Sequence, residues 1–307
     1  MTCGDLIDLQ VNGYAGVDFN SDDLTEEQFL EACRRLHSDG VKRFLPTLIT
    51  DRLETLAARA QKLARFIERN RDVTRVVAGI HLEGPFISPQ PGYVGAHPAG
   101  AVRTATVDEA LRLVDACDGH AKLVTLAPEH DDGCKTIRAL VDRGVRVSAG
   151  HCNPTLDQLD QAIDAGLSMF THLGNGCPLS LPRHDNIIQR VLSCSQRLWV
   201  CFIADGVHVP FFALQNYLDA AGLDRAIVVS DAISAAGGGV GEHWLAGQRV
   251  HVDADYATWS EDRSHLVGSA LSLPQAYTNL RNRLGLSDEE AIRLTRLNPA
   301  AAIGEGL

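Results

Sequence analysis

The residues best suited to metal chemistry stand where short apolar, strand-like runs end. Glu83 closes a run that begins at Arg75, and a Gly-Pro pair follows it. His151, His172 and Asp231 close three further runs of the same kind. Buried parallel strands read as continuous apolar runs, and the residues at their C-terminal ends meet on one face of the fold. We therefore expect these four side chains to meet around one metal ion.

Each of these residues is weak evidence when taken alone. A lone histidine at the end of a strand is more often structural than a ligand, and a lone aspartate there can cap the next helix. The combination is more specific, because it joins one carboxylate and two imidazoles to a second carboxylate at the last strand. Three protein ligands that leave a fourth position open are typical of a hydrolytic zinc site.

The elements that would hold these residues alternate regularly along the chain. Eight segments are predicted as strands, at 6–11, 43–50, 75–83, 121–127, 145–151, 168–172, 198–204 and 226–231. Nine segments are predicted as helices, at 25–38, 52–70, 106–117, 134–143, 155–165, 186–195, 211–221, 270–284 and 287–296. Pro46 counts against the second strand, because proline donates no hydrogen bond to a sheet.

This alternation predicts an α/β fold, a (β/α)8 TIM-type barrel. A doubly wound open sheet is the alternative, which would need fewer strands or a second domain. We expect one barrel domain over 1–307, with a hairpin excursion at about 237–268 where Gly-Gly-Gly precedes two short strand-like runs. The loops at 84–105 and 174–185 are long and rich in glycine and proline, and loops of this length are usually functional.

The composition excludes several classes of partner. The net charge is −11, and no cluster of five or more basic residues occurs, so we expect no nucleic-acid surface. No apolar run approaches the roughly 20 residues that span a membrane. The eight cysteines form no C-x-x-C pair, and no secretory leader is visible, so we expect a cytoplasmic protein with mostly buried thiols.

At this point the sequence motifs resemble a known family. Asp8-Leu9-Gln10-Val11-Asn12-Gly13 and His81-Leu82-Glu83-Gly84-Pro85-Phe86 are similar to the most recognisable motifs of the N-acetylglucosamine-6-phosphate deacetylase family, in the amidohydrolase superfamily. Shorter motifs follow in the family's order, at 95–97, 126–129, 149–151, 171–173, 204–208, 229–232 and 267–271. The resemblance covers essentially the whole chain, and it implies hydrolysis of the acetamide of N-acetylglucosamine 6-phosphate to glucosamine 6-phosphate and acetate.

The resemblance also implies chemical roles for individual residues. Glu83, His151 and His172 match the family's metal ligands, so the expected cofactor is one divalent metal ion, Zn²⁺. Asp231 matches the catalytic carboxylate, which would act as general base and then as general acid. His97 matches a histidine that polarises the acetamide carbonyl.

Substrate contacts and an assembly are implied in the same way. His208, Arg183 and the backbone of Asn175 and Gly176 match the family's contacts to the sugar phosphate. In the family the residue that matches Arg183 reaches in from a neighbouring subunit, which implies a homodimer.

The first motif bears on the number of metal ions. Many amidohydrolases carry His-x-His at the end of the first strand and bind two metals, whereas this chain has Gln10 and Asn12. Neutral amides are poor ligands for zinc, so we expect a single metal. The alternative interpretation is that both amides merely hydrogen-bond to neighbouring loops.

Three departures from the family limit the substrate assignment. The family's pattern after the second metal histidine is replaced by Gly174-Asn175-Gly176-Cys177, which removes side chains from the expected pocket wall. Arg183 is followed by His-Asp where the family usually has Glu-Pro or similar. The small β-sandwich that the family builds from both ends of the chain is not recognisable in the sequence.

Cys152 and Cys177 flank the expected site and could contact the metal.

Two rival functions remain at this stage. The altered loop 174–185 is compatible with another N-acyl substrate, either an unphosphorylated acetylated sugar or an N-acyl amino acid. A non-enzymatic barrel is the second rival, although binding alone would not require Asp231 beside the metal. Trp259 is expected to pack in the hairpin excursion, and His265 is expected to be a surface or structural residue.

Overall fold

The computed structural model describes residues 5–306, and its central sheet follows the order of the chain. The eight strands are all parallel to their neighbours, and they are β1 (Leu6–Val11), β4 (Val41–Ile49), β5 (Ile80–Glu83), β6 (Ala121–Leu126), β7 (Arg146–Ala149), β8 (Met169–Phe170), β9 (Trp199–Ile203) and β10 (Ala226–Val229). A parallel bridge between Val11 and Ala232 brings the last strand back to the first. The predicted α/β barrel is therefore confirmed, and the open doubly wound sheet is excluded.

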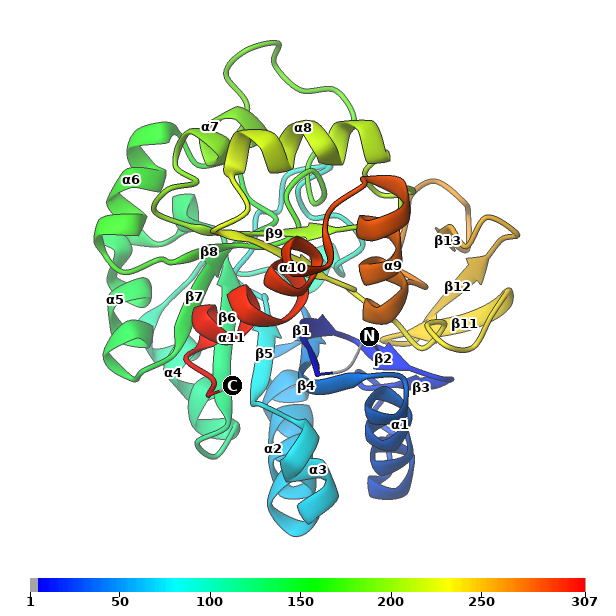
Figure 1. Cartoon of the computed structure of the whole chain (residues 1–307). Helices are drawn as coiled ribbons and strands as arrows, with labels where there is room; N and C mark the ends of the chain where they lie inside the picture. Colours follow the sequence, from blue (N-terminus) through cyan, green and yellow to red (C-terminus); the bar gives the residue numbers. More distant parts are fainter. Residues whose placement is uncertain (1–4, 307) are drawn as a thin grey trace.

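Helices surround this barrel (Figure 1). They are α1 (Glu26–Ser38), α2 (Leu53–Arg69), α4 (Val107–Ala116), α5 (Lys135–Asp142), α6 (Leu156–Asp164), α7 (Ile187–Ser193), α8 (Phe211–Ala221) and α9 (Leu273–Arg283). Helix α1 shows why these segments fold as predicted. Thr25 and Gln28 form a reciprocal capping box at its start, and Phe29 and Leu36 lie on the face that it buries.

The third strand is shorter than the sequence pattern predicts. The run that begins at Arg75 is not extended, because Arg71–Val76 forms helix α3, whose first turn is capped by the side chain of Asn70. The strand itself starts only at Ile80, after Gly79 turns the chain at φ +148°. Pro46, by contrast, lies inside β4, where it faces Val11 beside an irregularity in the pairing of the two strands.

The excursion after the last barrel strand is larger than the predicted hairpin. It is a three-stranded antiparallel sheet of β11 (Gly241–Leu245), β12 (Gln248–Val252) and β13 (Thr258–Ser260). Figure 1 shows it on one flank of the barrel, beside the small ribbon of β2 (Gly13–Tyr14) and β3 (Val17–Asp18). The backbone N–H of Ala246 donates to Asp18 Oδ2 at 2.7 Å, which ties the excursion to that ribbon.

The remaining elements are short. Single 3₁₀ turns lie at η1 (Ala99–Ala101), η2 (Pro128–His130) and η3 (Asp132–Cys134). The predicted last helix is interrupted, since α10 (Asp288–Ile292) passes through the π-helical turn η4 (Arg293–Leu297) into α11 (Asn298–Ile303). Pro299 lacks the N–H that a continuous α-helix would use there. Of the helices in residues 5–306, none is long and apolar enough to cross a membrane.

Candidate active site

The four residues predicted to meet do lie together at the C-terminal ends of the barrel strands. Glu83 is the last residue of β5, and His151, His172 and Asp231 each follow the end of a strand by two residues. These three have left-handed backbone conformations, with φ values of +51°, +32° and +51°. Residues other than glycine rarely adopt such backbone conformations, and strain of this kind is concentrated at functional sites.

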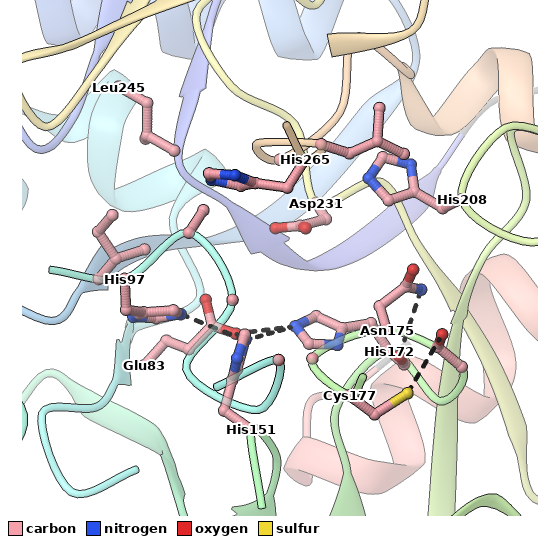
Figure 2. A pocket seen from close by; sticks show the side chains of 18 of the residues that line it. Glu83, His97, His151, His172, Asn175, Cys177, His208, Asp231, Leu245 and His265 are labelled. Carbon is pink, nitrogen blue, oxygen red and sulfur yellow. Dashed lines mark hydrogen bonds and ion pairs between the residues drawn. The ribbon is translucent and has the colours of Figure 1, made fainter. Parts of the chain in front are cut away.

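One carboxylate and three imidazoles form a buried cluster (Figure 2). Glu83 Oε1 lies 3.0 Å from His172 Nε2 and 3.4 Å from His151 Nε2. His151 Nε2 lies 3.2 Å from His172 Nε2 and also 3.2 Å from His97 Nε2. Zinc–nitrogen bonds of about 2.0–2.1 Å separate tetrahedral ligands by about 3.3 Å. The donor atoms are therefore spaced as the ligands of one metal ion would be.

The geometry alone allows more than one ligand set. Donor atoms of Glu83, His97 and His151 lie within 4.8 Å of one another, so His97 could replace His172 as the third ligand. The hydrogen bonds of His151 and His97 show which of these imidazoles can offer a lone pair to a metal. His151 Nδ1 lies 2.8 Å from the carbonyl oxygen of Tyr93, which can only accept, so His151 Nε2 keeps a free lone pair.

His97 has the opposite arrangement. Its Nδ1 accepts from the backbone N–H of Thr50 at 3.4 Å and lies 2.8 Å from the Thr50 hydroxyl. Nδ1 is then the unprotonated nitrogen, and Nε2 carries the hydrogen that faces the cluster. This tautomer makes His97 a hydrogen-bond donor to a ligand, and it leaves Glu83, His151 and His172 as the better metal-binding set.

Burial and charge shift the acid–base behaviour of the cluster. Burial opposes ionisation of Glu83, but hydrogen bonds from His151 and His172 hold its pKa well below the usual value. Burial and the neighbouring His151 lower the pKa of His97 to about 3, so this ring is neutral. Burial, with a contribution from Glu83, raises the pKa of Asp231 to about 6. A cation in the cluster would reverse the effect on Asp231, since it stabilises the ionised carboxylate.

The amides of the first motif lie under this cluster. Asn12 Nδ2 donates to Asp231 Oδ1 at 2.8 Å, so Asn12 does more than hold a neighbouring loop. Gln10 Nε2 and Asn12 Oδ1 are buried, and neither has a hydrogen-bond partner among residues 5–306.

A cavity of about 570 Å³ opens above the cluster. Among the predicted substrate contacts, His208, Asn175 and Gly176 line it. His208 Nδ1 lies 2.6 Å from Asp205 Oδ2, and this contact fixes the orientation of the ring. Arg183 is exposed on its loop and is not part of the wall. Within the described chain, no lysine or arginine lines this cavity.

Two glycines allow the loops to close around His151. A Cβ atom on Gly176 would lie 2.9 Å from His151 Nδ1, and one on Gly95 would lie 3.0 Å from His151 Cε1. Both glycines have positive φ values, +60° and +57°. Gly176 therefore lies too close to His151 to carry a Cβ atom without a shift of that ring.

The excursion contributes residues that the sequence interpretation missed. Leu245, Trp259, His265 and Leu266 all line the cavity, although Trp259 was expected to serve only packing and His265 only the surface. A signal was present, because the segment follows the last strand and must cross the same end of the barrel. Cys177 also lines the cavity, but burial raises the pKa of both the Cys152 and the Cys177 thiol, which disfavours a metal-binding thiolate at either residue.

Comparison with known proteins agrees with this geometry. The chain is 32% identical over 306 residues to the N-acetylgalactosamine-6-phosphate deacetylase of Escherichia coli O157:H7, covering 99% of this chain and 78% of that protein. It is 32% identical over 306 residues to the N-acetylglucosamine-6-phosphate deacetylase of Bos taurus, covering 97% and 73%. No protein-family model matches the chain.

The fold is shared with a solved structure. The N-acetyl-D-glucosamine-6-phosphate deacetylase of Mycobacterium smegmatis, in complex with N-acetyl-D-glucosamine-6-phosphate, superimposes with a TM-score of 0.89 at 28% identity. The match covers 98% of this chain and 77% of that one. The barrel, the site and these relatives define the class of the protein, a hydrolase that acts on an amide. Within that class, the chain belongs to the N-acetylglucosamine-6-phosphate deacetylase family.

Proposed function

We propose that this protein hydrolyses the acetamide of N-acetylglucosamine 6-phosphate, releasing glucosamine 6-phosphate and acetate. The observation that supports this most is the position of Asp231, a buried carboxylate beside the cluster of Glu83, His151 and His172. The substrates named for the relatives support the chemical class. A sugar phosphate does not cross a bilayer unaided because of its charge, which supports the proposal of a cytoplasmic enzyme.

One divalent metal ion, Zn²⁺, is part of the proposal. Glu83, His151 and His172 would hold it, as the donor spacing and the tautomer of His151 favour. When bound, such an ion lowers the pKa of a coordinated water towards neutrality and polarises the substrate carbonyl. Gln10 and Asn12 stand where a second metal would need histidines, so we propose a single ion.

The protein side chains would then move protons and orient the amide. Asp231 accepts the proton of the attacking water and returns it to the departing amine, which is otherwise a poor leaving group. The hydrogen on His97 Nε2 is donated to the acetamide oxygen, where negative charge develops. Asn12 keeps the Asp231 carboxylate in place through their 2.8 Å hydrogen bond.

The phosphate end of the proposed substrate would lie near His208, Asn175 and Gly176. The described cavity wall contains no lysine or arginine, so a phosphate dianion needs a cation from elsewhere. Arg183 is exposed outside the wall, which supports the proposal that it acts in the cavity of a second subunit within a homodimer. A single barrel domain over 1–307 remains part of this proposal.

Acetate release from three substrates tests this function. The panel consists of N-acetylglucosamine 6-phosphate, the unphosphorylated sugar and the 6-phosphate of the galactosamine epimer. We expect kcat/KM to be highest for N-acetylglucosamine 6-phosphate, and equal values with and without phosphate would contradict the assignment. In parallel, Asp231→Asn should keep its metal and lose turnover by about 10²–10⁴-fold. Unchanged turnover would remove Asp231 from the mechanism.

Another N-acyl substrate is the second candidate. The absence of a fixed cation in the described wall favours a less anionic substrate. The same panel, extended by an N-acetyl amino acid, distinguishes the two, and its decisive members are the unphosphorylated sugar and the N-acetyl amino acid. A barrel without enzyme activity has lost its support, because the relatives are hydrolases.

A further inference from the structure

The two ends of the cavity differ in chemistry. Beside His208 and Asn175 the wall is polar, and it belongs to the loops that follow the later barrel strands. On the His97 side the wall includes Ile49, Ala96 and Leu245, which pack in one hydrophobic cluster. Figure 2 shows this division, with Leu245 and His97 on one side and His208 and Asn175 on the other.

The apolar end is built by the excursion. Leu245 is the last residue of β11, and it is 3% exposed. It packs in a separate hydrophobic cluster that includes Ile49 of the barrel, Val250 and Val252 of β12, and Val267, which follows the excursion sheet. This packing on both sides fixes the position of the Leu245 side chain.

The excursion is also tied to the loop that carries His97. Gln248 Nε2 donates to the carbonyl oxygen of Ala96 at 3.3 Å, and Ala96 packs against the same hydrophobic cluster. The apolar wall and the proposed hydrogen-bond donor to the carbonyl therefore belong to one connected unit. The carbonyl carbon of an amide carries an oxygen, a nitrogen and an acyl group. If its oxygen reaches His97, the acyl group must lie near this wall or near Asp231.

The orientation of the substrate follows from the three substituents of the amide carbon, and this inference rests on the proposed function. The oxygen would face His97, and the nitrogen would face Asp231 with the sugar beyond it towards His208. The acyl group is then left on the side of Leu245. We propose that Leu245, with Ile49, forms an acyl-binding chamber that sets the longest acyl chain the enzyme accepts.

Kinetics on a series of acyl chains tests this proposal. The substrates are the N-acetyl, N-propionyl and N-butyryl forms of glucosamine 6-phosphate, which differ only by methylene groups. A pocket distinguishes one methylene by about 10–200-fold in kcat/KM. We expect the wild type to prefer acetyl, and we expect Leu245→Ala to raise the propionyl-to-acetyl ratio of kcat/KM by about tenfold or more.

Two further variants control for folding and position. Ile49→Ala alters the same wall from strand β4, and it should shift the ratio in the same direction. Val240→Ala lies on the same excursion at an exposed residue outside the cavity, and its ratio should equal that of the wild type. Thermal melting shows whether each variant is folded.

The outcomes separate this inference from the proposed function. If the wild type releases no acetate from the phosphorylated sugar, the proposed function is wrong. If the wild type is active but neither Leu245→Ala nor Ile49→Ala changes the chain-length ratio in folded protein, the acyl chamber alone is overturned. A ratio that changes equally in Val240→Ala would also overturn it, because the effect would then not come from the cavity wall.

Discussion

Asn12 Nδ2 donates a 2.8 Å hydrogen bond to Asp231 Oδ1 across the seam where the barrel closes. Asn12 follows the first strand by one residue, and Asp231 follows the last strand by two. The backbone repeats the connection, since Asn12 N–H donates to the carbonyl oxygen of Ala232 at 2.7 Å. The proposed base is thus oriented by the same residues that close the barrel.

Replacing Asn12 should therefore affect turnover more than binding. In Asn12→Ala the Asp231 carboxylate loses its side-chain donor, and we expect kcat to fall by about 10–100-fold with little change in KM. Metal content by elemental analysis should stay at the wild-type value. A large rise in KM with unchanged kcat would instead indicate a role for Asn12 in substrate binding.

Gly176→Ala should weaken metal binding. Its Cβ would lie 2.9 Å from His151 Nδ1, the atom that holds the ring through the carbonyl of Tyr93. We expect metal affinity to fall by about 10–100-fold, as happens when the orientation of a metal ligand is disturbed. The matched control is Gly119→Ala, which has a positive φ of +84° but open space around the new Cβ. Equal losses in both variants would show that backbone strain, not contact with His151, is the cause.

The clustering of the proposed metal ligands was predictable because it depends on local features. Each apolar run delivers its polar residue to the same end of a parallel barrel, so Glu83, His151 and His172 could be grouped before any coordinates. Helices that begin at an N-cap residue, such as Thr25 or Thr155, could also be predicted, because these caps are recognisable in the sequence.

What the sequence could not show depends on tertiary contacts. The run that begins at Arg75 has the composition of a strand, yet its first residues belong to helix α3, whose N-cap is Asn70. Leu245 and Trp259 enter the cavity only because the excursion folds back over the barrel. The tautomers of His97 and His151 depend on Thr50 and Tyr93, which no spacing rule connects to them.

Asp8 should make the stability of the protein depend on pH. It lies inside the barrel, where burial raises its pKa from 3.8 to about 7 despite hydrogen bonds from Ser230 and Gln10. The fold therefore favours the protonated carboxyl. Its contribution to stability is complete below pH 3.8 and is lost as the pH rises towards 7. Asp8→Asn removes this titration.

Urea unfolding at pH 5 and pH 8 measures the effect. Relative to Asp8→Asn, the wild type should lose about 2–3 kcal/mol of unfolding free energy between these pH values. Asp23→Asn, at an exposed position, should follow the wild type. If the wild type and Asp8→Asn show the same pH dependence, Asp8 is ionised in the fold and the assignment is wrong.

Hybrid dimers test the proposed role of Arg183. Arg183→Ala and Asp231→Asn should each have low activity on the phosphorylated substrate. After subunit exchange, a hybrid would contain one complete site, with Asp231 from one chain and Arg183 from the other. Random exchange should restore about a quarter of the wild-type activity. No recovery in exchanged dimers would place Arg183 in its own subunit or outside the reaction.

We propose that one metal ion, held by Glu83, His151 and His172, is required for amide hydrolysis. The most direct measurement is acetate release from N-acetylglucosamine 6-phosphate while Zn²⁺ is titrated into chelator-treated protein. We predict that activity is absent in the metal-free protein, rises in proportion to added metal and reaches its plateau at one equivalent per chain. Full activity without metal, or a plateau only at two equivalents, would contradict this account.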